Sequence, residues 1–413
     1  MDKVMVKCGL LGRSLAHSYS PQIHMHFGDY PYTLMEKEPD EIADFLQKGD
    51  FTGINVTIPY KKAVLPYCNT LTPIAERLGA VNTVIRQKDG SLLGHNSDYL
   101  GCYSMIRRLG ISLAGKKALV LGSGGASVTA AAVLQDMGAV PVVISRSGEN
   151  HYGNLQQHAD AALIVNATPV GMYPKVEEAP LTLEAFPQLE AVADMIYNPA
   201  RTKLLLEAES RGLKTENGLW MLVAQAWESA KFFTGEAIAE SQIQSVHSHL
   251  QRHMENIVLI GMPGCGKSTV GAALAKALEK TLVDADTEIE KAAGITIPEI
   301  FEKFGESGFR SIETDVLCRF GKESGLVIAT GGGCVTREEN YNHLHRNGKI
   351  LWLQRALETL PAEGRPLSLK GNIQAMYEAR EPMYRRFADM AVSNDGSVTE
   401  TVEEILKAMG YPL

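Results

Sequence analysis

A glycine-rich segment near the middle of the chain ends in a lysine and a serine. It reads Gly261-Met-Pro-Gly-Cys-Gly-Lys267-Ser268, and it lies between an apolar run, residues 257–260, and an alanine-rich run, residues 269–278. In a strand–loop–helix of this kind, backbone N–H groups surround phosphates, the lysine reaches the β- and γ-phosphates, and the serine hydroxyl offers an oxygen to Mg²⁺. The pattern predicts a site for the phosphates of a nucleotide, formed by Gly264, Cys265, Gly266, Lys267, Ser268 and Thr269.

Two carboxylates follow at the end of the next predicted strand. Asp284 and Asp286 are separated by one residue. Carboxylates with this spacing can share a metal ion and a substrate, because hard cations prefer oxygen ligands.

A second glycine loop lies earlier in the chain. Gly122-Ser-Gly124-Gly-Ala-Ser127 follows the apolar run 118–121 and opens another alanine-rich run. Here Gly122 permits a tight turn, Gly124 lets the backbone approach a pyrophosphate, and the small Ser127 lets the helix pack closely on the sheet. The pattern predicts a dinucleotide site, with Gly122, Gly124, Gly125 and Ala126 as cofactor-binding residues.

The strand expected after this helix ends in Ser145-Arg146-Ser147. An acidic residue at this point would bind the ribose 2′-hydroxyl of NAD, and the segment contains none. An arginine between hydroxyls suits a 2′-phosphate, so Ser145 and Arg146 favour NADP(H) as the cofactor. The alternative is a solvated arginine after a strand.

Six further segments of the first half complete a pattern that resembles the shikimate dehydrogenase family. The resemblance extends from about Gly9 to Phe233. The segments are residues 17–24, 53–61, 79–83, 94–98, 166–172 and 218–225. The resemblance implies a substrate-binding domain followed by a Rossmann-type cofactor domain.

The family resemblance gives Lys61 and Asp98 the catalytic roles. A lysine can stabilise and protonate the alkoxide that hydride transfer to a ketone creates, and a nearby carboxylate can orient that lysine. The resemblance also implies that Ser18 and Ser20 bind the substrate carboxylate, although both could serve as helix N-cap residues before Pro21. The remaining expected substrate residues are Thr57, Asn82, Tyr197 and Gln225, and Met195 and Gly218 are assigned to the cofactor.

Two departures from the family pattern are visible. The usual Asn-Thr-Asp-Gly reads Asn96-Ser97-Asp98-Tyr99, which keeps the reactive groups. Only 18 residues, 148–165, separate Ser147 from Asn166, where the family usually has more helix and strand. We therefore expect a trimmed cofactor domain with a more open adenosine side.

The second half resembles shikimate kinase over almost all of residues 256–409. The matching segments, besides the phosphate loop and the two aspartates, are residues 309–313, 329–333, 364–367 and 384–386. The resemblance implies that the nucleotide at the phosphate loop is ATP, that Asp284, with Ser268, holds Mg²⁺ and that Asp286 orients the attacked hydroxyl. It implies that the carboxylate is bound by Arg310 and Arg385, that backbone closes on the ring at Gly331, Gly332 and Gly333, and that Lys267 and Arg365 act at the transferring phosphate.

Bulk properties agree with two enzymes in one soluble chain. At 413 residues the chain exceeds the roughly 250–300 residues of a single core. A net charge of −8 argues against a nucleic-acid-binding face, and no apolar run approaches the roughly 18 residues of a membrane span. Six cysteines without a CxxC pair suggest reduced thiols. We expect a cytoplasmic protein with small-molecule substrates.

These elements give an α/β chain of several domains. We predict a substrate domain over residues 1–100 and 217–245, a Rossmann-like NADP-binding domain over 101–216, a linker over 246–255, and a P-loop kinase domain with a parallel sheet over 256–413. The linker could instead continue a helix that starts near Leu219.

The expected function is a bifunctional enzyme of chorismate and aromatic amino acid biosynthesis. It would reduce 3-dehydroshikimate with NADPH and then phosphorylate shikimate with ATP. Two alternatives stay open: a quinate/shikimate dehydrogenase in the first half, and a nucleotide-binding regulatory protein with inactive sites.

Overall fold

A computed structural model describes residues 6–16, 18–360 and 373–411. Contacts divide the chain into two compact units. The first consists mainly of residues up to Leu250, and the second of residues from Gln251 onward together with the short segments 173–176 and 198–201. Both units are α/β structures built on largely parallel sheets, which confirms the predicted fold class.

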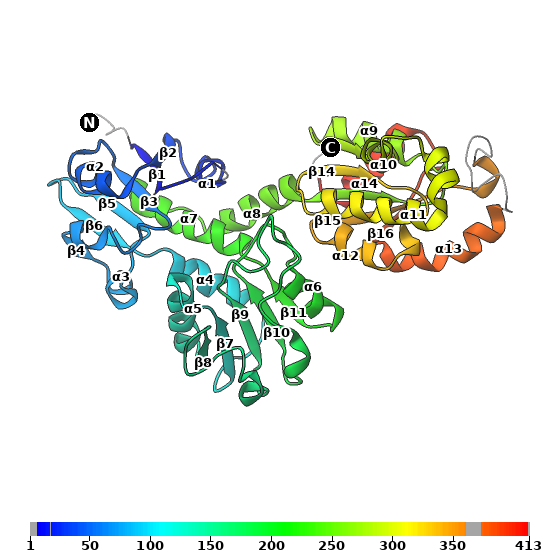
Figure 1. Cartoon of the computed structure of the whole chain (residues 1–413). Coiled ribbons are helices and arrows are strands. Elements are labelled where there is room, and N and C mark those ends of the chain that lie inside the picture. The colour runs from blue at the N-terminus through cyan, green and yellow to red at the C-terminus, as the bar shows by residue number, and fades with distance from the viewer. Residues whose placement is uncertain (1–5, 17, 361–372, 412–413) are drawn as a thin grey trace. The chain divides into compact units, whose positions relative to one another are not determined.

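The first sheet of the first unit has six strands, coloured blue to cyan in Figure 1. Two neighbouring strands, β1 (Cys8–Gly12) and β3 (Gly53–Val56), are buried along their whole length, as expected for strands covered on both faces. Short 3₁₀ turns and the helices α1 (Ser20–His24), α2 (Ile42–Lys48) and α3 (Pro73–Leu78) connect the strands. The order across the sheet is β2 (Tyr32–Glu36), β1 (Cys8–Gly12), β3 (Gly53–Val56), β5 (Thr83–Arg86), β6 (Leu92–His95) and β4 (Thr70–Leu71).

The second sheet has five parallel strands with β7 (Lys117–Leu121) next to the centre. The order is β11 (Lys214–Glu216), β10 (Ala191–Asp194), β9 (Leu163–Asn166), β7 and β8 (Val140–Ile144). This is a Rossmann order without the strand that usually lies beyond the second one, so β8 forms an edge. Within residues 145–162, all described, the only helical segment is the 3₁₀ turn at Leu155–His158. The short stretch noted in the sequence between Ser147 and Asn166 therefore forms only this helical turn before β9.

Helices pack on both sheets of the first unit. They are α4 (Asp98–Arg108), α5 (Gly125–Asp136), α6 (Lys203–Ser210) and α7 (Leu219–Thr234). Helix α7 reaches back to the first sheet, where the Phe233 ring lies so close to Gly53 that an added Cβ would be 2.2 Å from it. Figure 1 shows α7 in green beside the blue strand β3. The same helix also packs along α4, so it carries residues to the region between the two sheets.

The segment expected as a linker, residues 246–255, lies almost wholly in a helix. Helix α7 ends at Gly235, which has a left-handed conformation (φ 69°), so the following α8 (Ser241–Met254) is a separate helix. Ile243, Val246 and Leu250 are buried on one face of α8. This apolar stripe at helical spacing explains why a polar segment is ordered as a helix.

The second unit contains a third, five-stranded parallel sheet. Its strand order is β13 (Thr281–Asp284), β14 (Leu326–Ala329), β12 (Asn256–Ile260), β15 (Gly348–Gln354) and β16 (Met390–Ser393). The helices are α9 (Lys267–Ala277), α10 (Ala285–Ala293), α11 (Ile297–Gly321), α12 (Glu339–His345), α13 (Ile373–Phe387) and α14 (Val398–Ala408). β12 is fully buried, and the phosphate loop follows it directly. Among the described residues, no helix is both long and apolar enough to cross a bilayer.

Candidate active sites

A cavity of about 500 Å³ in the first unit brings together most of the residues predicted for the dehydrogenase site. They come from the start of α1, from the turns beside β3 and β5, from the first residues of α4 and α5, from the loop after β10 and from α7. Those lining the cavity are Ser18, Ser20, Thr57, Lys61, Asn82, Asp98, Ala126, Met195, Tyr197, Gly218 and Gln225. Residues more than 200 positions apart therefore meet at one site.

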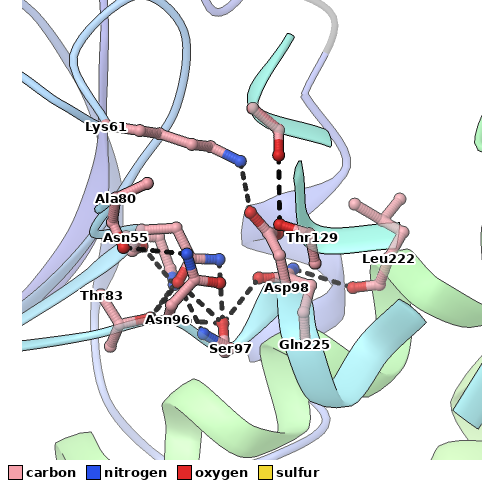
Figure 2. A network of polar contacts seen from close by, with 12 residues as sticks. Asn55, Lys61, Ala80, Thr83, Asn96, Ser97, Asp98, Thr129, Leu222 and Gln225 are labelled. Carbon is pink, nitrogen blue, oxygen red and sulfur yellow. Dashed lines mark hydrogen bonds and ion pairs between the residues drawn. The ribbon is translucent and has the colours of Figure 1, made fainter. Parts of the chain in front are cut away.

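Lys61 and Asp98 form an ion pair in this cavity. Lys61 Nζ lies 2.5 Å from Asp98 Oδ2, and the two side chains are 31% and 16% exposed. Asp98 is the first residue of α4, where the helix dipole favours a carboxylate. Figure 2 shows the lysine extending from the turn after β3 toward the aspartate. The pair can deliver a proton to a group bound beside it.

A buried hydrogen-bond network lies beneath the pair, centred on Ser97 (Figure 2). The Ser97 N–H donates to Asn82 Oδ1 at 2.7 Å, and Asn82 Nδ2 donates to Ser97 Oγ at 3.0 Å. Ser229 Oγ lies 3.0 Å from Ser97 Oγ and accepts from Asn55 Nδ2 at 2.8 Å. The orientation of both asparagine amides is therefore fixed within the protein.

No role was predicted for Asn55 or Ser229 from the sequence. Asn55 lines the cavity from β3. Ser229 follows Gln225 by four residues on α7, so both face the same side of the helix. The four-residue spacing from Gln225 was the sequence signal that could have placed Ser229 near the site.

Ser18 and Ser20 lie where the chain enters α1. Ser18 Oγ accepts a hydrogen bond from the Ser20 N–H at 3.2 Å, and Ser20 is buried. The N-cap residue of α1 is Tyr19, and its own side chain makes no capping hydrogen bond. Neither serine is therefore the N-cap residue, although the Ser18 hydroxyl accepts the N–H of Ser20, the first residue of the helix.

The second glycine loop has the geometry expected of its pattern. Gly122 has φ 110°, and an added Cβ would lie 3.0 Å from the Thr168 side chain, so a larger residue is excluded there. Gly124 is the N-cap of α5, and the space beside Gly124 and Gly125 is open. Ser127 Oγ donates to the Gly122 carbonyl at 2.6 Å and closes the loop.

Ser145 and Arg146 lie outside the cavity, after β8. The carbonyl of Ile144, the last residue of β8, accepts from the Gly122 N–H at 2.8 Å. Ser145 and Arg146 therefore come directly after the strand that contacts the glycine loop, and Arg146 is exposed.

A buried carboxylate supports the loop that carries Met195 and Tyr197. Asp194 accepts hydrogen bonds from Asn166 Nδ2 (3.0 Å), the Ile196 N–H (3.0 Å) and Thr202 Oγ1 (2.7 Å). Burial raises the pKa of Asp194 to about 6. This residue was missed from the sequence, although it immediately precedes Met195.

The second unit has its own cavity, of about 560 Å³. It brings together the predicted residues of the phosphate loop and the substrate site. They are Gly264, Gly266, Lys267, Ser268, Thr269, Asp286, Arg310, Gly331, Gly332 and Gly333. Cys265 is fully buried behind the loop, so only its backbone can contribute to a phosphate site.

The phosphate loop is held in place by contacts on both sides. Lys267 Nζ donates to the carbonyls of Gly261 and Met262, both at 3.0 Å. Asn394, after β16, donates from Nδ2 to the Cys265 carbonyl at 2.6 Å and accepts from Thr401 Oγ1 at 2.9 Å. The Asn394 amide also lies 2.5 Å from the position of a Cβ on Gly266, which has φ 97°. Asn394 was not predicted from the sequence.

Ser268 and Asp284, predicted as metal ligands, lie side by side. Ser268 Oγ donates to Asp284 Oδ2 at 2.5 Å, and the other oxygen of Asp284 accepts from the backbone at the start of α10. A hydroxyl and a carboxylate beside a phosphate loop are oxygen ligands that suit Mg²⁺.

Arg310 and Glu313 form a buried ion pair in the cavity wall. Arg310 Nη1 lies 2.7 Å from Glu313 Oε2, and the side chains are 7% and 0% exposed. They are therefore not the surface pair that their spacing also allowed. Burial raises the pKa of Glu313, and Arg310 opposes this shift. A Cβ on Gly333 would be 2.1 Å from Arg310 Nη2, so a larger residue there would displace the arginine from its position beside Glu313.

The structure does not bring Arg385 to the cavity and places Arg380 there instead. Arg385 is 72% exposed and pairs with Glu381 on the same helix. Arg380 lines the cavity and donates to the Gly332 carbonyl at 3.2 Å. Tyr384, four residues after Arg380, is buried and donates to the same carbonyl. Arg365 lies outside the described residues.

Family models match both parts of the chain. The shikimate dehydrogenase substrate binding domain matches residues 10–84, and shikimate kinase matches residues 263–410. A shikimate dehydrogenase (NADP(+)) from Clostridium perfringens is 32% identical over 265 residues, which cover 59% of this chain and 97% of the relative. One from Caldicellulosiruptor saccharolyticus is 37% identical over 262 residues, covering 55% and 92%.

Solved structures agree with these relatives. Shikimate dehydrogenase 1 from Peptoclostridium difficile superposes with a TM-score of 0.55 at 34% identity, covering 60% of this chain and 98% of the other. Shikimate 5-dehydrogenase from Thermus thermophilus, solved with NADP(H) and shikimate, gives 0.54 at 32% identity, covering 59% and 99%. The chain thus belongs to the shikimate dehydrogenase family, and with a shikimate kinase domain at residues 263–410 it is a shikimate-pathway fusion.

Proposed function

We propose that the chain catalyses two consecutive reactions. The first unit reduces 3-dehydroshikimate to shikimate with NADPH, and the second transfers the γ-phosphate of ATP to the 3-hydroxyl of shikimate. The observation that carries the first assignment is the Lys61–Asp98 pair, which shares one cavity with Ala126 of the glycine loop. The product of the first reaction is the substrate of the second, which links the two assignments chemically.

In the reduction, hydride transfer to the substrate carbonyl leaves negative charge on its oxygen. Lys61 donates the proton to this oxygen, and Asp98 orients the ammonium and accepts a hydrogen bond from the adjacent hydroxyl. Asn82, Thr57 and Gln225 bind the remaining hydroxyls. Because the Asn82 amide is already fixed by Ser97, little reorganisation accompanies substrate binding.

NADPH is the proposed reductant. The glycine loop and the N-terminus of α5 would bind the pyrophosphate, and Arg146 would pair with the 2′-phosphate. Two observations support this choice: the cavity-side position of the loop, and the NADP(+) named for the relatives.

In the phosphorylation, Asp286 accepts the proton of the attacking hydroxyl, while Lys267 neutralises charge on the transferring phosphoryl group. Arg310 and Arg380 bind the substrate carboxylate. Ser268 and Asp284 would hold Mg²⁺, which when bound neutralises the phosphate oxygens. Arg365 is proposed to act at the phosphate from the segment outside the described residues.

The proposed division of labour follows the predicted boundaries. Residues 1–100 and 217–245 bind and turn over the first substrate, residues 101–216 bind NADPH, residues 246–255 connect the halves, and residues 256–413 form the kinase. The Asn55–Ser229 bond supports assigning α7 to the substrate domain.

One incubation tests the whole proposal. Purified protein receives 3-dehydroshikimate, NADPH and Mg-ATP, and the products are identified by mass spectrometry. Shikimate 3-phosphate is the expected product. Shikimate alone would refute the kinase assignment, and the absence of any product would refute the dehydrogenase assignment.

A second candidate activity is oxidation of quinate. A quinate dehydrogenase from Corynebacterium glutamicum, solved with NAD, is 26% identical and superposes with a TM-score of 0.53. Turnover of shikimate and quinate, each with NADP⁺ and NAD⁺, separates the two. We expect shikimate with NADP⁺ to give the highest kcat/KM.

A further inference from the structure

Three side chains from three helices meet at Asp136, the last residue of α5. The Tyr99 hydroxyl donates to Asp136 Oδ2 at 2.5 Å. Arg77 binds the same carboxylate with two nitrogens, at 2.6 Å to Oδ2 and 3.0 Å to Oδ1. We call Arg77, Tyr99 and Asp136 the α5 clamp.

The clamp joins elements of both sheets in the first unit. Arg77 belongs to α3, which follows β4 of the first sheet, and Asp136 ends the helix that follows β7 of the second. Tyr99 is the second residue of α4 and directly follows Asp98, the partner of Lys61.

The start of α4 is thereby held on both sides of Asp98. On one side, the Ser97 N–H is bound by Asn82. On the other, Tyr99 is bound by Asp136. The first turn of a helix lacks intrahelical partners for its N–H groups and frays unless other contacts hold it. The clamp supplies such a contact next to the ion-paired aspartate.

The chemistry of the clamp favours a persistent contact. A carboxylate at a helix C-terminus is opposed by the dipole, so Asp136 needs a cationic partner, and Arg77 provides the bidentate geometry that makes such pairs effective. Hydrogen bonds from Arg77 and Tyr99 lower the pKa of Asp136, so both contacts favour its ionised form. Burial, followed by the bond to Asp136, raises the pKa of Tyr99 to about 12, so the phenol remains a donor.

We propose that Tyr99 is a positioning residue for Asp98: its bond to Asp136, itself held by Arg77, fixes the first turn of α4 and with it the Lys61–Asp98 pair. The proposal rests on the proposed dehydrogenase function. It concerns this chain's own side chain, because the pattern that the segment resembles has glycine at this position.

The kinetic test compares Tyr99→Phe with Tyr103→Phe. Tyr99→Phe removes only the hydroxyl that reaches Asp136, and Tyr103→Phe makes the same change one turn further along α4. We expect Tyr99→Phe to lower the dehydrogenase kcat about 3- to 10-fold with little change in KM, since misplacing a reacting group affects turnover more than binding. Tyr103→Phe and the kinase activity should stay at wild-type levels.

A double-mutant cycle assigns the effect to the clamp. Asp136→Asn should lower kcat to a similar extent, and the double variant should be no slower than the slower single variant, because both changes remove one contact. Effects that multiply in the double variant would overturn the proposal.

Hydrogen–deuterium exchange without ligands gives a readout independent of turnover. Amides of residues 98–102 should exchange faster in Tyr99→Phe than in wild type or Tyr103→Phe. Unchanged exchange, or faster exchange with unchanged kcat, would overturn the positioning role. If the wild-type protein lacked dehydrogenase activity, the proposed function itself would fail, whatever the exchange result.

Discussion

At the scale of single residues, two adjacent lysines have different surroundings. Lys61 is paired with Asp98 inside the cavity, whereas Lys62 is exposed. We predict that Lys61→Met lowers the dehydrogenase kcat by at least about 100-fold and affects KM much less, because it removes the proton donor. Lys62→Met serves as the matched control and should keep wild-type turnover. Steady-state oxidation of shikimate with NADP⁺ measures both, and near-normal turnover of Lys61→Met would exclude Lys61 from the chemistry.

The two arginines of α13 make a similar comparison for the kinase. We predict that Arg380→Met lowers kcat/KM for shikimate by roughly 10- to 100-fold, the value of a charge-assisted hydrogen bond to a bound carboxylate. Arg385→Met removes a side chain that is exposed and paired with Glu381, so its kinetics should match wild type. A coupled assay for ADP release with varied shikimate separates the variants. The reverse ranking would restore Arg385 to the site.

Helical spacing explains which residue assignments could be made from the sequence. Arg380 precedes the buried Tyr384 by four residues and therefore shares its face, while Arg385 turns away. That signal was present in the sequence. By contrast, the contact of Asn394 with the Cys265 carbonyl joins residues 129 positions apart and could not be read from local pattern.

At the scale of elements, Asp194 anchors the loop after β10 and is a source of pH-dependent stability. Its folded-state pKa is raised from 3.8 to about 6, so the folded chain keeps a proton that the unfolded chain loses between these values. The stabilisation by the protonated form is therefore complete below about pH 4 and disappears as the pH rises through about 6. The loss amounts to roughly 3 kcal/mol.

The isosteric variant Asp194→Asn tests this pH dependence. Asparagine does not titrate, so we predict that Tm of the variant minus Tm of wild type increases from pH 4 to pH 6.5. Calorimetric scans at several pH values measure this difference. A difference that stays constant with pH would show that Asp194 does not titrate in this range.

The elements themselves could be predicted well where an apolar run is followed by a glycine loop. Both loops lie after buried strands, because such short runs are covered on both faces of a parallel sheet. Helix α8 was harder, since its buried stripe consists of only a few apolar residues among polar ones. Its packing partners lie outside the local sequence.

At the scale of the whole molecule, each unit contains its own cavity with its own reactive residues. We predict that the two activities are separable. A mixture of the Lys61→Met and Lys267→Met proteins should convert 3-dehydroshikimate to shikimate 3-phosphate at about the wild-type steady-state rate, because shikimate diffuses freely between molecules.

The control for this mixture is each variant alone. Lys61→Met should phosphorylate added shikimate normally, and Lys267→Met should accumulate shikimate without its phosphate. If both single activities were normal and the mixture were still much slower than wild type, the intermediate would be retained within one molecule.

The edge position of β8 has a consequence for solubility. The Val140 N–H and the Ile144 carbonyl form hydrogen bonds on the β7 side of the strand. Because the backbone groups of successive strand residues point to alternate sides, those of residue 141 face the free edge. A proline there offers no N–H, and an incoming strand from another molecule would lack one of its ladder bonds. Val140 and Val143 are exposed beside it, on the kind of apolar edge that invites strand addition. A longer cofactor domain would have covered this edge with another strand. In this chain the edge is free, and Pro141 protects it against aggregation.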